Sequence, residues 1–228
     1  MAVPSVAARV GAVTVPSPAF ERFAAVCGIA AGITSFCYAS AFILLRNNLL
    51  SALFLLLSGV LTSAVLVAVY GRLRDTAPDF ARLGALLTLA GAGGSLIHGG
   101  YDLAVALSPS AAANVDLPNP VDPRGLLTFG VMGLGLFLIV ALMPQSKQFP
   151  RTLVAVGYLL AILLVAIYLG RVIVLDATSP VLLVPALLAG FLVNPAWYIW
   201  LGLIFRRMNH RKEAAVGEPN GRPQTVVI

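Results

Sequence analysis

Two ionisable side chains lie within a long apolar stretch of the chain. His98 and Asp102 are four residues apart, and Gly91 and Ser95 precede them at spacings that place all four on one face of a helix. An aspartate at the centre of a bilayer costs about 2.5–3.5 kcal/mol. We therefore expect Asp102 to face protein or water and to be paired with a basic side chain. His98 is interpreted either as a hydrogen-bonded packing residue or as a residue that binds a ligand or carries a proton.

Arginines supply the candidate partners of Asp102. Arg171, near the end of the fifth apolar segment, is the preferred partner, with Arg124 next and Arg46 third. The pair formed with Arg171 has two interpretations, a structural ion pair or part of a ligand site.

The sixth apolar segment carries a polar residue followed by a proline. Pro195 lacks a backbone donor and clashes with the helix one turn back, so it is expected to kink the helix and free a carbonyl. The segment Gly190–Trp197 also aligns with Gly94–Tyr101 at an offset of 96 residues. Inverted repeats with interrupted helices in matching positions are typical of transporters, and chance similarity is the competing explanation.

Long apolar runs must position these residues. The chain is 59% hydrophobic and only 11% charged, whereas soluble domains have about 25% charged residues. A helix needs about 20 apolar residues to cross a bilayer. The sequence therefore predicts an all-α integral membrane protein, a six-helix transmembrane bundle occupying residues 23–205. Its predicted spans are Phe23–Leu45, Leu49–Tyr70, Leu83–Leu107, Gly125–Met143, Leu153–Leu175 and Val181–Phe205.

The basic residues predict the orientation of the bundle. Twelve of the 15 fall on the side that carries both termini, and three on the other side. Because short cytoplasmic loops are enriched in Lys and Arg, both the segment Met1–Arg22 and the tail Arg206–Ile228 are expected in the cytoplasm. The tail is expected to be disordered after its first turn. The same rule accounts for the net charge of +6, so nucleic-acid binding is not predicted.

The long loop Ser108–Arg124 is rich in proline and is expected to fold back over the outer end of the bundle. This would bring Asp122 or Arg124 near the polar residues of the spans. The predicted pocket comprises His98, Tyr101, Asp102, Asp122, Arg124, Tyr168, Arg171, Asn194 and Trp197.

The sequence motifs that enzymes of common classes require are absent from the chain. The chain has no P-loop, G-x-S-x-G, H-E-x-x-H or C-x-x-C motif, which disfavours an enzyme, and no metal site is predicted. No particular cofactor is indicated. Gly28 and Gly32 form a G-x-x-x-G pair, for which packing within the bundle is preferred over dimerisation.

Four short motifs carry a family resemblance: His98-Gly-Gly-Tyr-Asp102, Pro118-Asn-Pro-Val-Asp-Pro-Arg124-Gly, Tyr168-Leu-Gly-Arg171 and Asn194-Pro-Ala-Trp-Tyr198. Through them the chain resembles uncharacterised bacterial multi-helix membrane proteins that are grouped as a domain of unknown function. The resemblance covers about Phe23–Phe205 and implies a helical bundle in the bacterial cytoplasmic membrane. It carries no functional residues.

Small-molecule binding or transport through an outward-facing polar pocket is the preferred function. The alternative is a non-catalytic accessory subunit of a larger membrane complex, and a membrane enzyme comes third. Membrane lipids are the expected partners, while a membrane-protein partner and a homo-oligomer both stay open.

Overall fold

The computed structural model describes residues 16–108, 124–174, 176 and 179–217, and the side chains of the last helix as far as His210. Every regular element in this part of the chain is helical. Six helices are long and apolar enough to cross a membrane. The predicted all-α architecture with six membrane-length helices is therefore confirmed.

Three of the six long helices contain a π-helical segment, denoted η. The elements in chain order are α1 (Pro18–Ala39), η2 (Ser40–Leu44), α2 (Asn48–Leu73), α3 (Pro78–Leu107), η4 (Leu126–Val131), α4 (Met132–Ser146), α5 (Arg151–Ile173), α6 (Pro180–Leu188), η5 (Ala189–Val193) and α7 (Asn194–Gly217). The first span is α1 with η2, the fourth is η4 with α4, and the sixth runs through α6, η5 and α7.

Capping residues set where these helices begin. The Ser17 side chain accepts a hydrogen bond from the Phe20 amide at 3.2 Å, and Pro18 occupies the first turn of α1. Asn47 caps α2 in the same way, accepting from the Leu50 amide at 3.0 Å. Hydropathy marks only the apolar part of each helix, so the observed helices start before most of the predicted spans.

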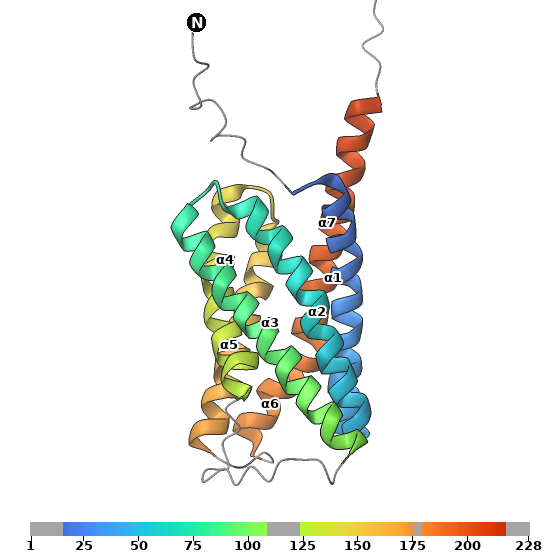
Figure 1. The fold of residues 1–228 in the computed structure, drawn as a ribbon. Coiled ribbons are helices and arrows are strands. Elements are labelled where there is room, and N and C mark those ends of the chain that lie inside the picture. Colours follow the sequence, from blue (N-terminus) through green and yellow to red (C-terminus); the bar gives the residue numbers. More distant parts are fainter. Residues whose placement is uncertain (1–15, 109–123, 175, 177–178, 218–228) are drawn as a thin grey trace, which may run out of the picture.

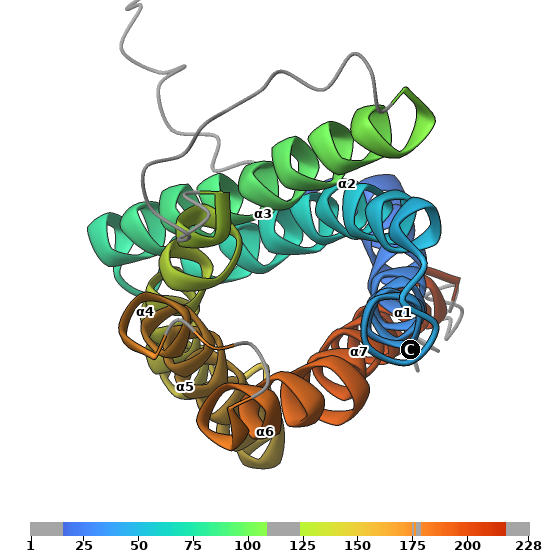
Figure 2. The same ribbon diagram turned by 90° about the horizontal axis from the view of Figure 1, so that it is seen from below.

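The helices form a closed bundle. In Figure 1 they run up and down in turn, and the view along the bundle in Figure 2 shows them arranged around its centre. Each helix packs against the next in the chain, and α7 packs against α1, which closes the ring. The α1–α7 contact depends on glycines, because a Cβ at Gly28 would lie 2.9 Å from the Gly202 Cα. The preference for packing of Gly28 within the bundle is confirmed.

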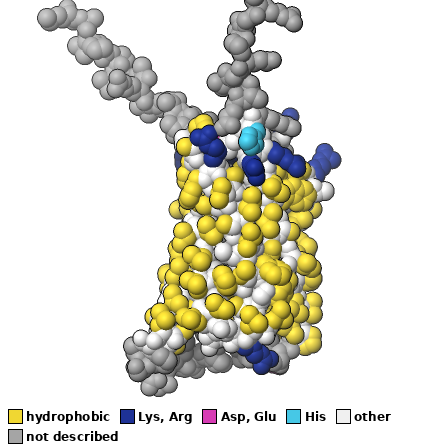
Figure 3. Space-filling view, turned by 90° about the vertical axis from the view of Figure 1, so that its right-hand side faces the viewer, with side chains coloured by type: hydrophobic (Ala, Val, Ile, Leu, Met, Phe, Trp, Pro, Cys, Tyr) yellow, Lys and Arg dark blue, Asp and Glu magenta, His cyan; other side chains and the backbone are white. Residues whose placement is uncertain are grey.

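The outer surface of the bundle is apolar around its middle. The space-filling view shows hydrophobic side chains along the bundle and Lys and Arg side chains at its two ends (Figure 3). The exposed large side chains are mainly Leu, Ile, Val and Phe, as expected of a surface that meets lipid. These features are compatible with a multi-pass membrane protein.

Among the described side chains, basic residues are unequally divided between the two ends of the bundle. The end at which α1 begins has eight: Arg22, Arg72, Arg74, Arg82, Lys147, Arg151, Arg206 and Arg207. The opposite end has three: Arg46, Arg124 and Arg171. We call these the terminal end and the far end.

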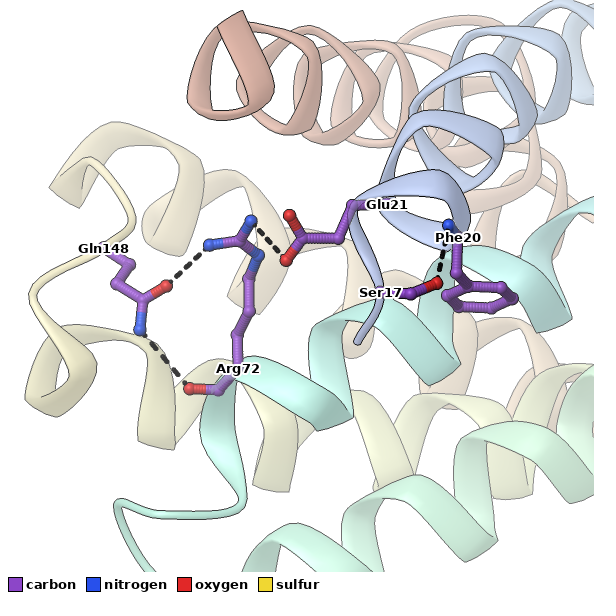
Figure 4. A network of polar contacts seen from close by, with 5 residues as sticks. All are labelled: Ser17, Phe20, Glu21, Arg72 and Gln148. Carbon is purple, nitrogen blue, oxygen red and sulfur yellow. Dashed lines mark hydrogen bonds and ion pairs between the residues drawn. The ribbon is translucent and has the colours of Figure 1, made fainter. Parts of the chain in front are cut away.

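A buried ion pair joins three parts of the terminal end. The Arg72 guanidinium donates to Glu21 at 2.7 Å, and the two side chains are 6% and 0% exposed. Arg72 also donates to the Gln148 side-chain oxygen at 2.9 Å, which links α2 to the turn between α4 and α5 (Figure 4). The guanidinium carbon lies 5.4 Å from the centre of the Phe205 ring on α7.

This pair was not predicted from the sequence, because Glu21 was placed before the first helix. By hydropathy alone the first apolar run begins at Phe23, whereas α1 begins at Pro18. Glu21 therefore lies in the first turn of α1, where a carboxylate also interacts favourably with the helix dipole.

We predict that Glu21→Ala strongly destabilises the protein, because Arg72 would remain buried without its partner. Breaking such a pair costs about 3–5 kcal/mol. The exposed pair of Asp79 and Arg82 is the matched control, with side chains 93% and 65% exposed, and Asp79→Ala should cost at most about 1 kcal/mol. Thermal unfolding in detergent measures both, and equal losses would contradict the assignment.

Candidate functional site

The predicted partner of Asp102 is partly corrected by the structure. The Arg124 guanidinium donates to Asp102 at 2.8 Å, and the His98 Nε2 atom lies 3.4 Å from the other carboxylate oxygen. Arg171, the preferred partner, makes no ion pair with Asp102, although both lie within the described residues. The preference for Arg171 was wrong, because chain position near one end of a bundle does not determine which helices are neighbours. Here η4 packs against α3.

The same arginine also contacts an aromatic ring. The Arg124 guanidinium carbon lies 4.4 Å from the centre of the Tyr101 ring, within the range of a cation–π interaction. Asp102 and Arg124 are 38% and 27% exposed, so they are accessible at the far end of the bundle. This cluster joins α3 to the start of the fourth span. Its ion pairs and its cation–π contact are sufficient to explain these residues by a structural role.

A cavity lies in the half of the bundle toward the far end. It has a volume of about 180 Å³ and is mostly apolar, with walls from the first, fourth, fifth and sixth spans. Its polar lining residues are Ser35, Tyr38, Arg171 and Asn194.

A second, smaller cavity of about 80 Å³ adjoins the first. The two share lining residues from four spans: Ser35, Tyr38, Phe129, Leu164 and Asn194. The second cavity adds α2 and α3 to its walls and is lined by more hydroxyl groups, those of Ser58, Thr62, Ser95, Thr128 and Tyr198. Together they make one central cavity that reaches from Arg171 toward the middle of the bundle.

All three π-helical segments line the central cavity. Phe42 belongs to η2, Phe129 to η4 and Gly190 to η5. A π-helical turn is rare and is found frequently at functional sites, because it shifts side chains from their regular α-helical positions. Their convergence on one cavity makes it the candidate functional site.

Three hydroxyl groups of the cavity, those of Thr62, Ser95 and Thr128, donate to their own helices. Thr62 donates to the Ser58 carbonyl at 2.8 Å, and Thr128 donates to the Arg124 carbonyl at 3.1 Å. Each hydroxyl hydrogen is then used, but the oxygen keeps its capacity to accept a hydrogen bond. The Asn194 amide donates to Ser35, which joins the sixth span to the first. These groups therefore present mainly acceptors to the cavity.

Arg171 supplies the charge of the cavity. It extends from the last turn of α5, and no carboxylate lines either cavity among the described residues. An arginine can bind a carboxylate through two parallel hydrogen bonds. The arrangement thus combines one cationic group, several acceptors and a largely apolar wall.

The structure divides the predicted pocket into several parts. Arg171 and Asn194 line the central cavity, whereas His98, Tyr101, Asp102 and Arg124 form the neighbouring cluster. The remaining positions have other surroundings: Tyr168 packs against Gly130, Trp197 is fully buried, and Asp122 lies outside the described residues, as does the loop Ser108–Arg124 apart from its two end residues.

Ser35, Tyr38 and the hydroxyl residues of α2 were not predicted as site residues. A periodic signal was present, since Ser35, Tyr38 and Phe42 recur at three and four residues, as do Leu55, Ser58 and Thr62. Such spacing places each set on one helix face.

Comparisons with models of protein families, with curated proteins and with solved structures find no match for this chain. Its described residues contain no group of His, Cys, Asp and Glu side chains that could hold a metal ion. The fold and the cavity define its class: an all-α bundle of six helices long and apolar enough to cross a membrane, with a central cavity in one half. The similarity to bacterial multi-helix proteins stays a prediction.

We predict that a double-mutant cycle with Asp102→Asn and Arg124→Gln shows coupling, whereas one with Asp102→Asn and Arg171→Gln shows none. The coupling should be about 0.5–1 kcal/mol, because Asp102 is more than one-third exposed. Unfolding midpoints in detergent provide the measurement, and coupling only to Arg171 would contradict the observed pairing.

Proposed function

We propose that the protein binds a small amphipathic anion in the central cavity and carries it across the membrane. The convergence of three π-helical segments on a cavity with one arginine is the observation that supports this function. A helix packed only for stability has no need of π-helical turns, and retaining three of them at one site favours a role in binding.

The lining indicates the chemistry of the ligand. Arg171 favours a carboxylate, while Phe42, Phe129 and Ile167 provide an apolar surface for the rest of the molecule. A cavity of 150 Å³ holds a benzene molecule, so a cavity of about 180 Å³ suits a molecule of about that size. A small aromatic or short branched carboxylate fits these limits.

Transport, beyond binding, is supported by the asymmetry of the bundle. The cavity occupies the far half, and the terminal half is filled by large buried side chains such as Leu66, Met143 and Phe205. Access from one side with a closed opposite side is one state of an alternating-access cycle. The π-helical segment η5 between α6 and α7 offers a place for movement within the sixth span.

The unequal number of basic side chains at the two ends supports an orientation of the bundle in the membrane. Eight basic side chains at the terminal end against three at the far end support a cytoplasmic location of both termini. The cavity then faces outward. The bacterial cytoplasmic membrane is the location implied by the family resemblance.

A non-catalytic accessory subunit is the weaker proposal. Such a subunit would present a lipid-facing patch of Gly, Ala and Ser to its partner. The exposed residues in the described part of the bundle include many large ones, such as Val26, Leu86 and Leu192.

We predict that a single thiol introduced as Ala112→Cys, after Cys27→Ala and Cys37→Ala, reacts with a membrane-impermeant maleimide in intact cells. Thr225→Cys in the same background should react only after permeabilisation. Labelling in the reverse pattern would contradict cytoplasmic termini.

We predict that benzoate raises the unfolding midpoint of the purified protein, whereas the neutral analogue benzamide has much less effect. A ligand at a hundredfold excess over its Kd stabilises the folded state by about 2.7 kcal/mol. Thermal unfolding in detergent measures the shift for both compounds.

Two cavity variants and one control variant test whether benzoate acts at the central cavity. Arg171→Gln should abolish the benzoate shift, and Ala186→Phe should prevent binding of both compounds by filling the cavity. Arg46→Gln removes an exposed arginine at the same end and should keep the shift. A benzoate shift that persists in Arg171→Gln would reject the proposed site.

A further inference from the structure

A second, separate site lies at the terminal end of the bundle. A groove of about 220 Å³ lies between the first turns of α1 and the part of α7 from Arg206 to His210. It shares no lining residue with the central cavity. Its polar lining consists of Arg22 from α1 and Arg206, Asn209 and His210 from α7. No carboxylate lines it among the described residues, so its chemistry favours an anion.

Asn209 provides the independent sign of a ligand. This side chain is only 4% exposed, and neither its nitrogen nor its oxygen has a hydrogen-bond partner within the described part of the protein. A buried polar group without a partner costs about 1–3 kcal/mol. A ligand in the groove would relieve this cost if it offered both an acceptor for the Asn209 nitrogen and a donor for its oxygen.

The rest of the groove is apolar and reaches the surface that meets lipid. Ala25, Val26 and Ile29 of α1 complete its lining, and Val26 is 68% exposed. Figure 3, which faces the side of α1 and α7, shows a histidine among the dark-blue Lys and Arg side chains at this end, above the hydrophobic surface. The charged part of an occupant would therefore lie at the level of lipid headgroups and its apolar part against α1.

We propose that this groove binds an anionic phospholipid whose headgroup carries a phosphodiester and a free hydroxyl, of the phosphatidylglycerol type. The phosphate oxygens accept from Arg206 and the Asn209 amide, Arg22 adds positive charge beside them, and the headgroup hydroxyl donates to the Asn209 oxygen. Basic pockets between membrane helices bind lipid headgroups in this way. Phosphatidylcholine lacks the hydroxyl donor and carries a trimethylammonium group that the two arginines would repel.

The test uses the full-length protein, purified in detergent and supplied with single lipids. Native mass spectrometry should show retained phosphatidylglycerol and at least tenfold less phosphatidylcholine at equal concentration. The double variant Arg22→Gln/Arg206→Gln should lose at least tenfold of the phosphatidylglycerol binding. Arg207→Gln removes an exposed arginine that does not line the groove and should bind within twofold of the unaltered protein.

Asn209→Leu keeps the proposal testable if the double variant does not fold. Removing the unpaired amide should raise the unfolding midpoint without lipid and reduce the additional shift caused by phosphatidylglycerol. Inorganic phosphate and glycerol phosphate distinguish a lipid site from a site for a soluble anion, and both should give little shift. The proposal is overturned if phosphate matches the lipid, if both phospholipids bind equally, or if Arg207→Gln loses as much binding as the double variant.

Discussion

The hydrocarbon interior of a membrane offers no hydrogen bonds, and this constraint governs the polar residues of the bundle. Every hydroxyl, amide and charge on the spans must find a partner within the protein or lie beside a cavity. Thr62 and Thr128 satisfy their hydroxyl hydrogens on their own helices, and Asn194 donates to Ser35 on another helix. Glu21 and Arg72 pair with each other. Within the central cavity, the hydroxyl hydrogens of Thr62 and Thr128 and the Asn194 amide are thus used inside the protein, which leaves Arg171 as the charged donor of the site.

Two features of the helices, glycines and π-helical segments, have opposite effects on how closely the helices pack. Glycines such as Gly28 and Gly202 allow α1 and α7 to approach closely near the terminal half. The π-helical segments η2, η4 and η5 occur in the far half, where they displace backbone and side chains around the cavity. Close glycine contacts also occur in the far half, as at Gly94 and Gly99, so the π-helical turns are what distinguishes the hollow half. The same helices build both, so the difference lies in local sequence and not in topology.

The sequence predicted the six helices well because an apolar run of membrane length has few other stable structures. It could not predict which arginine pairs with Asp102, because that depends on which helices are neighbours and on the position of η4. Glu21 was missed since hydropathy does not detect a helix that begins with a capping serine and a proline. Ser35 and Tyr38 were missed since hydroxyl residues are common in membrane helices, and only the fold shows whether they face lipid, a neighbour or a cavity.

Whether the proposed ligand would only bind or would also be transported depends on the terminal half. A passage from the cavity to the terminal end must separate side chains packed around Trp197 and Phe205, and Arg72 lies against the Phe205 ring while it is held by Glu21 and Gln148. Opening along this route would break or move a buried ion pair, which is costly unless water replaces the lost partner. Water entering the opening would supply that replacement and lower the cost. The pair can therefore act as a closed gate in the dry state, whereas a protein that only binds would keep it intact throughout.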